Sequence, residues 1–383
     1  MSLLSILEPK NREPADCQVF VNGQELIELY PYLLEVEVDV SRAAAATMKL
    51  SFETRRDENG RWVVQDSGLL ENWMPVKIVA AFGANTEEVM RGYIKNIKVD
   101  YPQDTGATKV IVECQDDSIK LDREHHRENW GGDVPTNDFT ILQTILGRYD
   151  LMLHPHSGAG STGLTLNQDG SDIQFLKKRQ EANGYEMLFA DGLVYFGPLR
   201  LSGTPQDTIK VYAGTDTNCY SFSVDAKGDQ PDRVQYDMAT VQGQETLSEV
   251  IEPDIPVLGD TPANSDSANV GDYIWRMQRP SGVDEEQVRA LAQHKANILS
   301  LKVEASGELD GSLYGHVLKV AELVSVDGTG YWLGGLYYVD QVTHKFNADG
   351  YRQSFKLLRN AYGDNFHSSM AQSALSNALS GLF

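Results

Sequence analysis

Hydrophobic and polar residues alternate along much of the first third of the chain. The alternating runs lie at residues 18–21, 35–40, 47–53, 76–82, 89–101 and 108–114. A period of two places neighbouring side chains on opposite faces, so each run predicts a half-buried β-strand. Asn22-Gly23, directly after the first run, favours a tight hairpin. Residues 17–115 are therefore expected to form a β-barrel or a β-sandwich.

Between residues 116 and 200 the apolar spacing changes to three and four. This spacing predicts a helix at Phe139, Ile141, Leu142, Ile145 and Leu146. A second helix is expected to begin with Asp172 as its cap and to stop at Gly184. Asp191-Gly192 between two apolar runs predicts a hairpin. The segment is expected to be a small α+β insert.

Strand patterns return after the insert. Strands are expected at residues 208–212, 221–225 and 232–238, followed by a long loop at 252–272. Ser281 and Asp284 form a capping box, which predicts a helix over residues 281–300. A hairpin should follow, with its turn at 347–350 and one face of its returning strand formed by Tyr351, Gln353, Phe355 and Leu357.

The last twenty residues carry an apolar stripe at helical spacing. One interpretation is a helix that binds a partner protein, and the other is a frayed chain end. The candidate partner-binding residues are Phe366, Met370, Leu375, Leu379, Leu382 and Phe383.

The chain has 55 acidic and 33 basic residues in a length of 383, which gives a formal charge of −22. Such a surface does not favour DNA or an anionic membrane, because phosphate binding needs Lys and Arg. Repulsion could instead keep a polyanion from sticking to an acidic channel, but simple solubility is the preferred explanation of the charge. We expect no sequence-specific nucleic-acid binding and no stable membrane anchoring, since no run approaches the ~18 apolar residues of a membrane span.

The N-terminus lacks the basic and apolar regions of a signal peptide. We therefore expect the protein to be made in the cytoplasm and not to leave by the general secretion route. Cys17, Cys114 and Cys219 are far apart and show neither a disulfide framework nor zinc spacing.

No catalytic pattern is apparent in the sequence. His125-His126 and the pair His154 and His156 lack a third metal ligand at a known spacing. Asp116-Asp117 could be chance neighbours in a chain this acidic, and no nucleophile elbow or phosphate-binding loop is present. We expect no enzymatic activity, no cofactor and no metal.

Three segments, taken in order, carry a family resemblance. The first is Glu88–Ile97 with Val110–Asp116, the second is Ser171–Arg179 with the hairpin around Asp191-Gly192, and the third is Gly335–Val339 with His344. Together they resemble the phage late-control protein D family, the baseplate hub proteins of contractile tails. They also resemble the N-terminal hub part of the valine-glycine-repeat spike proteins of type VI secretion. The resemblance covers residues 17–360.

The resemblance implies a mainly β fold with an α+β insert: two tube-like β-barrel domains, a small α+β domain and a C-terminal tail. The expected domains are residues 1–115 for the first hub barrel, completed by about 201–245, and 116–200 for the insert. The second hub barrel is expected at 246–363, with the helix 281–300, and the amphipathic tail at 364–383.

The implied function is that of a structural baseplate hub in a contractile phage tail or a phage-tail-like injection particle. A homotrimer would present six barrels, join the six-fold tail tube to the three-fold spike and form an axial channel. Its partners would be the tail tube protein, a separate spike protein, other baseplate proteins and the tape measure. One alternative is a type VI spike hub component. Another is a β-rich glycan-binding protein or cell-wall hydrolase, with Trp62, Trp73, Trp130, Trp275 and Trp332 stacking on sugars.

Overall fold

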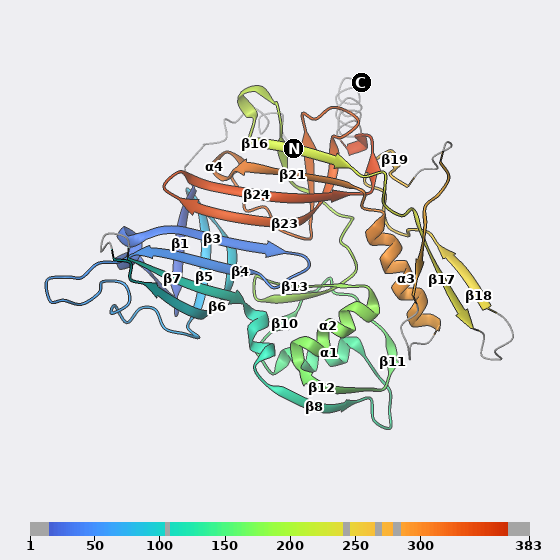
Figure 1. Ribbon diagram of the computed structural model, residues 1–383, viewed down its shortest axis with the longest axis horizontal. Helices are drawn as coiled ribbons and strands as arrows, with labels where there is room; N and C mark the ends of the chain where they lie inside the picture. The colour runs from blue at the N-terminus through green and yellow to red at the C-terminus, as the bar shows by residue number, and fades with distance from the viewer. Residues whose placement is uncertain (1–14, 104–107, 240–245, 265–269, 279–284, 367–383) are drawn as a thin grey trace, which may run out of the picture.

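Two groups of strands, far apart in the sequence, join in one large sheet (Figure 1). The computed structural model describes residues 15–103, 108–239, 246–264, 270–278 and 285–366. The first group of strands comprises β1 (Ala15–Val21), β2 (Gln24–Glu25), β3 (Leu33–Ser41), β4 (Thr47–Glu53), β5 (Pro75–Phe82), β6 (Asn85–Asp100) and β7 (Lys109–Asp116). The second comprises β15 (Gln206–Lys210), β16 (Cys219–Ala226), β21 (Val303–Asp310), β22 (Leu323–Asp327), β23 (Gly335–Asn347) and β24 (Gly350–Arg359).

The first group forms the first half-barrel, in which the strands lie side by side in the order β1-β5-β6-β7-β4-β3. The alternating runs of the sequence place one face of each strand in a shared apolar core that includes Val38, Leu50, Ile78 and Val112. The short β2 returns from β1 through Asn22-Gly23, both at positive φ, as the turn residues predict. A 3₁₀ helix, η2 (Ile27–Tyr32), leads from β2 to β3.

The second group forms the second half-barrel, in the order β15-β22-β23-β24-β21-β16. Its core contains four buried aromatic residues, Tyr314, Tyr337, Tyr338 and Phe355. Asn218 links β15 to β21 through two hydrogen bonds. Its side-chain oxygen accepts from the Lys210 N–H at 2.8 Å, and its carbonyl accepts from the Asp310 N–H at 3.0 Å.

The two half-barrels repeat one plan. Numbered along the chain, and leaving β2 aside, the strands of each lie in the order first, fourth, fifth, sixth, third, second. A register shift falls between Leu33 and Glu35 in β3, and the equivalent shift falls between Cys219 and Ser221 in β16. A second register shift falls between Ile94 and Asn96 in β6, and the equivalent shift falls between Val339 and Gln341 in β23. Bulges fix the register of a sheet, so these matches define residue-by-residue equivalence.

The backbone ahead of the fourth strand repeats as well. Trp73 and Ala321 both have positive φ, which non-glycine residues seldom adopt. Trp73 N–H donates to the Ile94 carbonyl at 2.7 Å, and Ala321 N–H donates to the equivalent Val339 carbonyl at 2.9 Å. One difference remains: β1 pairs antiparallel with β5, whereas β15 pairs parallel with β22.

A single ladder unites the half-barrels. The second part of β23 pairs antiparallel with β3, from Gln341 opposite Ser41 to Asn347 opposite Glu35. The expected mainly β fold with two related barrels is confirmed. The expectation that residues 201–245 complete the first barrel is wrong, because β15 and β16 pair with β22 and β21 of the second half-barrel.

The first insert, residues 117–200, leaves from the end of β7 and lies below the large sheet in Figure 1. Its elements are η4 (Asp117–Asp122), β8 (His125–Trp130), β9 (Thr136–Asn137), α1 (Asp138–Gly147), β10 (Met152–Leu153), β11 (Thr162–Leu164), β12 (Leu166–Ser171), α2 (Asp172–Asn183), β13 (Glu186–Ala190) and β14 (Leu193–Gly197).

Both helices of the first insert were expected, with two differences in detail. Ser171, not Asp172, is the N-cap residue of α2, because Asp172 is buried and accepts hydrogen bonds from Gln168 and Tyr149. Phe139 is exposed, whereas the other four apolar residues of the α1 stripe are buried. Gly184 ends α2 in the left-handed conformation, as predicted.

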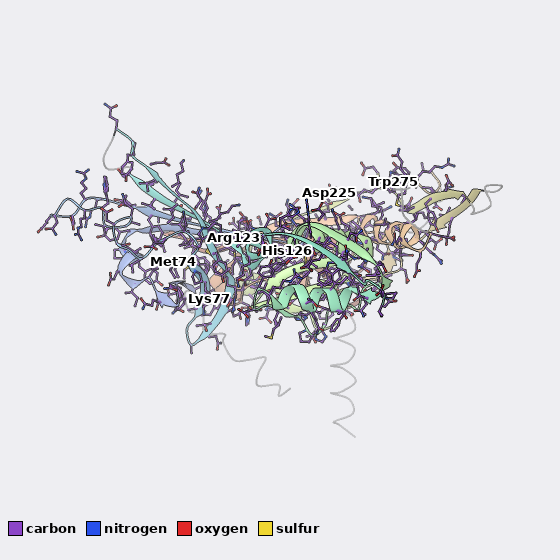
Figure 2. All side chains as sticks on the ribbon, turned by 90° about the horizontal axis from the view of Figure 1, so that it is seen from below. Met74, Lys77, Arg123, His126, Asp225 and Trp275 are labelled. Carbon is purple, nitrogen blue, oxygen red and sulfur yellow. The ribbon has the colours of Figure 1, made fainter. Side chains whose placement is uncertain are left out.

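The second insert, residues 227–302, separates β16 from β21 and was not anticipated as a unit. Its strands β17 (Arg233–Ala239), β18 (Thr246–Ile251) and β20 (Ile274–Met277) form a small sheet against α3 (Glu285–Leu299). Figure 2 shows Trp275 of this sheet toward the opposite end of the molecule from Met74 of the first half-barrel. The predicted capping box, Ser281–Asp284, lies outside the described residues. Four short elements complete the described fold: η5 (Gly214–Asp216), α4 (Gly311–Tyr314), and β19 (Thr261–Pro262), which pairs with β25 (Ala361–Tyr362).

Candidate functional site

One ion cluster, centred on the buried Glu186, joins the two half-barrels and the first insert. Arg42 lies in the turn between β3 and β4, and its Nη1 donates to Glu186 Oε1 of the first insert at 2.9 Å. Its Nε donates to Asp340 Oδ1 of the second half-barrel, also at 2.9 Å. The Tyr338 hydroxyl donates to the other Glu186 oxygen at 2.5 Å. Burial raises the pKa of the Glu186 carboxyl, and the Arg42 charge opposes that rise.

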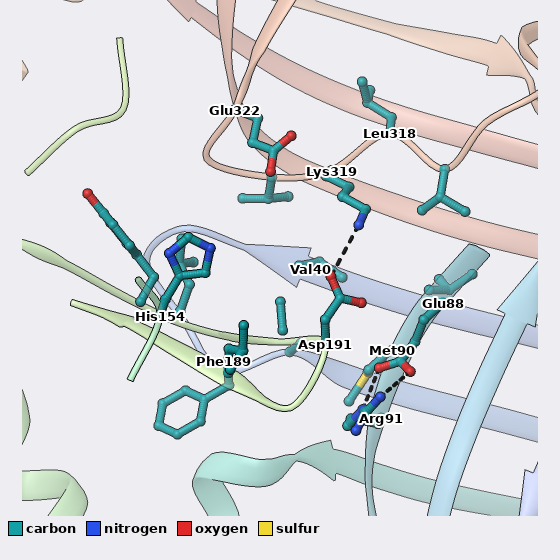
Figure 3. Close-up of a pocket in the computed structure, with 18 of the residues that line it drawn as sticks. Val40, Glu88, Met90, Arg91, His154, Phe189, Asp191, Leu318, Lys319 and Glu322 are labelled. Carbon is teal, nitrogen blue, oxygen red and sulfur yellow. Dashed lines mark hydrogen bonds and ion pairs between the residues drawn. The ribbon is translucent and has the colours of Figure 1, made fainter. Parts of the chain in front are cut away.

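A cavity of about 150 Å³ lies beside this cluster, between the β13–β14 hairpin, β6 and residues 317–322 (Figure 3). Asp191, at the hairpin tip, forms an ion pair with Lys319 at 3.1 Å, and Arg91 forms one with Glu88 at 2.5 Å. Burial and the neighbouring Arg200 charge lower the pKa of His154. None of the described residues around this cavity is a serine, threonine or cysteine. The cavity therefore lies at a junction between packed units and offers no hydroxyl of serine or threonine and no thiol.

The histidines singled out in the sequence make contacts with neighbouring side chains. His344 is buried, its Nδ1 lies 2.9 Å from the Tyr351 hydroxyl, and burial lowers its pKa to about 3. His125 pairs with Asp169 on the surface of the first insert, while the His154 and His156 rings lie 5.4 Å apart. Across the described residues, no three His, Cys, Asp or Glu side chains converge in a group that could hold a metal ion.

The five tryptophans do not gather on one surface of the fold. Trp62 and Trp73 lie between β4 and β5, Trp130 in the first insert, Trp275 in the second, and Trp332 before β23. Trp332 is exposed but stacks on Tyr362, with ring centroids 5.3 Å apart. This scatter does not resemble a sugar-binding platform.

A polar face runs across the whole molecule. It is the outer side of eight neighbouring strands, β16-β21-β24-β23-β3-β4-β7-β6, whose other side packs on the two cores. Its carboxylates are Glu35, Glu37, Asp39, Glu53, Asp100, Glu113, Asp225, Glu304, Glu308 and Asp310. The fewer cations are Lys49, Lys98, Lys109, Lys345, Arg352 and Lys356. Lys345–Glu35 at 2.8 Å and Arg352–Glu308 at 2.6 Å cross between strands on this face.

Two strand edges of the polar face carry no partner strand among the described residues. One is the outer edge of β16, the last strand of the sheet. The other is Asn96–Asp100 of β6, on the edge away from β7. The residues equivalent to these edges, in β3 and β23, are paired with each other inside the chain. Unpaired backbone groups on an edge favour the addition of another strand.

Neither the two edges nor the Arg42 cluster was identified from the sequence. The only sequence signal for the edges is the similarity of Tyr93-Ile94-Lys95-Asn96 to Tyr338-Val339-Asp340-Gln341. Of the tail residues singled out, Phe366 is half-buried at the end of the described chain. Met370, Leu375, Leu379, Leu382 and Phe383 lie outside the described residues.

The chain belongs to the family described as the Alg8 N-terminal domain, whose family model matches residues 11–348. No curated protein matches the chain in sequence.

Solved structures of tail proteins share the fold. The 43 kDa tail protein of prophage MuSo2 from Shewanella oneidensis has a TM-score of 0.66 at 12% identity, over 90% of this chain and 98% of that one. A tail protein from Neisseria meningitidis has a TM-score of 0.64 at 12% identity, over 91% and 97% of the two chains.

A type VI secretion component from E. coli, described as similar to the T4 tail proteins gp27 and gp5, has a TM-score of 0.53 at 12% identity. That match covers 91% of this chain and 78% of the other. The resemblance to tail hub proteins seen in the sequence is thus confirmed at the level of the fold.

None of the helices among the described residues is both long and apolar enough to cross a membrane.

Proposed function

We propose that the protein is the structural hub of a contractile phage tail or a phage-tail-like injection particle, acting as a homotrimer. The observation that carries the proposal is the pair of free edges on the polar face. Each edge is equivalent to an edge that is paired within the chain, so β16 of one copy fits Asn96–Asp100 of the next. Repeating the internal ladder between copies closes a ring of head-to-tail contacts.

The internal ladder gives the register of this contact. Thr343 lies opposite Asp39 inside the chain, and its hydroxyl donates to Asp39 Oδ1 at 2.6 Å. The matching bulges make Lys98 equivalent to Thr343 and Asp225 equivalent to Asp39. Lys98 of one copy therefore lies opposite Asp225 of the next, and Val99 lies opposite Val224. Opposite charges and apolar pairs across strands both stabilise such a contact.

Three copies place six half-barrels around an axial channel, and the polar face would line it. The excess of carboxylates on this face would repel a passing polyanion and so prevent it from adhering.

The two ends of the ring would differ in symmetry. One end carries the β6–β7 and β23–β24 connections, one from each half-barrel, at six similar positions. The other end carries the two different inserts, which leave from β7 and β16 and repeat only three times. The first end suits the six-fold tail tube, and the second suits the three-fold spike and other baseplate proteins.

The remaining assignments follow from this role. We propose no enzymatic activity, and a location in the tail of a virion or related particle. The tail residues from Phe366 to Phe383 would contact a partner such as the spike or the tape measure. A hub in a type VI system remains the alternative within this class, because a type VI component shares the fold. A glycan-binding protein or cell-wall hydrolase is disfavoured by the scattered tryptophans.

Charge reversal at the proposed contact tests the trimer. Lys98→Glu and Asp225→Lys should each weaken the trimer, since like charges then face each other in all three contacts. The double variant should restore the trimer, as measured by native mass spectrometry over a range of concentrations. Lys178→Glu, on the exposed side of α2, is the matched control and should change nothing. A stable monomer in the unsubstituted protein would refute the proposed hub, and trimers indifferent to both reversals would refute this register.

A further inference from the structure

The core of the first half-barrel is closed by residues of the second. Val317, Phe346 and Tyr351 come from the second half-barrel, yet they belong to the buried cluster of the first. Phe346 lies opposite Val36 in the ladder between β23 and β3, and its ring stacks on that of Tyr351 with the centroids 4.0 Å apart. The junction within the chain is therefore a shared hydrophobic core as well as a ladder of backbone hydrogen bonds.

Among the described residues, nothing closes the second half-barrel in this way at β16. Phe222 and Val224 pack against its core but are only half-buried. Their equivalents in β3, Val36 and Val38, are 1% and 0% exposed. The difference arises because β3 has β23 beside it, whereas no described strand lies beside the outer edge of β16. The second core is thus open where the first is closed.

The side chain that could close it is exposed at the free edge of β6. Tyr101 directly follows this strand, and the matching bulges of β6 and β23 make it the equivalent of Phe346. Tyr101 is 59% exposed, whereas Phe346 is 6% exposed. Trp62 packs edge-on against the Tyr101 ring at 5.2 Å, and the Gln65 amide donates to its hydroxyl at 3.2 Å. These contacts hold the aromatic side chain at the edge and leave most of it uncovered.

We propose that Tyr101 of one copy completes the core of the second half-barrel in the next copy. The inference rests on the proposed function and deepens it, because the contact between copies becomes a shared hydrophobic core, as the junction within the chain is. In the register of the internal ladder, Tyr101 lies opposite Phe222 and Val99 lies opposite Val224, all on the core side of the sheet. Since β6 and β16 lie toward opposite ends of the large sheet (Figure 1), each copy gives its Tyr101 to one neighbour and receives that of the other.

The shared core supplies what a ladder alone would not. Each backbone hydrogen bond between two edges replaces one to water, so its net contribution is small. Burial of aromatic and branched side chains adds a larger favourable free energy, and a buried tyrosine is a common anchor of protein interfaces. A second copy fits this edge on both sides of the sheet. The register that sets Tyr101 opposite Phe222 also sets Lys98 opposite Asp225 on the polar side.

Truncation of Tyr101 tests the proposal in the purified chain. Tyr101→Ala should weaken the trimer by about tenfold or more, since it removes the anchor from all three contacts. Tyr101→Phe should keep the trimer, because the equivalent Phe346 closes the internal junction with a ring that has no hydroxyl. Phe139→Ala, at an exposed aromatic residue of the first insert, is the matched control and should change nothing. Native mass spectrometry over a range of concentrations measures dissociation, and circular dichroism shows whether each variant is folded.

A photo-crosslinker at Tyr101 gives a readout that does not depend on truncation. A benzophenone amino acid is placed there in a mixture of isotope-labelled and unlabelled chains, so that adducts between copies differ in mass from adducts within one. We expect mixed-label adducts at Phe222–Val224 of β16. The same amino acid at Phe139 should give no adduct on β16.

The outcomes separate this inference from the proposed function. An unsubstituted chain that stays monomeric at every concentration would overturn both. A trimer that Lys98→Glu weakens but Tyr101→Ala leaves unchanged would overturn the shared core and leave the hub intact. In a trimeric protein, adducts from Tyr101 that stay within one copy, or that fall on segments other than β16, would also overturn the shared core alone.

Discussion

At the scale of single residues, three parts of the fold meet at one guanidinium. Arg42 bonds to Glu186 and Asp340, which come from the first insert and the second half-barrel. Glu186 is buried, so removing its cation leaves a charge without compensation in a medium of low polarity. The cluster therefore fixes how the insert sits on the two half-barrels.

Arg42→Ala is expected to destabilise the protein by about 3–5 kcal/mol, the usual cost of breaking a buried ion pair. The double variant Arg42→Met with Glu186→Gln should recover most of that loss, because no isolated charge remains. Urea unfolding with a probe in each part measures both effects. Equal stability of Arg42→Ala and the unsubstituted protein would contradict a buried role for the pair.

His344 gives a prediction for pH. Burial lowers its folded pKa to about 3, well below the ordinary histidine value of about 6.5. The unfolded chain thus binds a proton below pH 6.5 that the folded chain does not, and stability falls as the pH drops from about 6.5 toward 3. This one group contributes up to about 1.4 kcal/mol per pH unit in that window.

His344→Gln should therefore lose less stability than the unsubstituted protein between pH 7 and pH 4, as measured by denaturant unfolding at each pH. Carboxylates titrate in the same range in both proteins, so only the difference between the two curves reports on His344. Parallel curves would show that the pKa of His344 is the same in the folded and unfolded protein, so that burial does not hold the ring neutral.

At the scale of elements, β23 pairs with three strands, β22, β3 and β24. Its first part pairs with β22 of its own half-barrel, and its second part pairs with β3 of the other. On its other edge it pairs with β24 along most of its length. Damage to β23 should therefore affect both half-barrels.

Val339→Asp is expected to prevent folding of the second half-barrel, because Val339 is 0% exposed and a buried carboxylate would have no partner. Leu336→Asp is the matched control on the same strand. Leu336 is only half-buried, so its aspartate can reach water and the variant should stay folded with reduced stability. Circular dichroism and gel filtration separate the two outcomes. A soluble, folded Val339→Asp protein would show that the strand faces are misassigned.

Strands and helices could largely be predicted from the sequence, because each depends on local periodicity and capping. The run 35–40, the Asn22-Gly23 turn and the stop at Gly184 all behave as their residues predict. Strand partners could not be predicted so readily. The strands at residues 206–226 were expected to complete the first barrel. They pair instead with strands that lie about a hundred residues later in the sequence. Pairing depends on non-local backbone hydrogen bonds, which leave little trace in a single strand.

At the scale of the whole molecule, the duplicated plan is what makes a ring possible. The ladder between β23 and β3 occurs once within the chain, and the free edges of β6 and β16 allow it to recur between chains. Net charge alone could not gather acidic residues on one surface. The polar face gathers them because eight strands from both half-barrels present one continuous side.

The sequence by itself determined the elements, the presence of an α+β insert, the absence of a recognisable catalytic pattern and the resemblance to tail hub proteins. These follow from local periodicity and from the order of short motifs. Only the tertiary structure decided which strands are partners, which bulges coincide, how Arg42 meets the buried Glu186 and which edges stay open. The reason is physical: register and edge exposure arise from contacts between distant segments, so they exist only once the chain has folded.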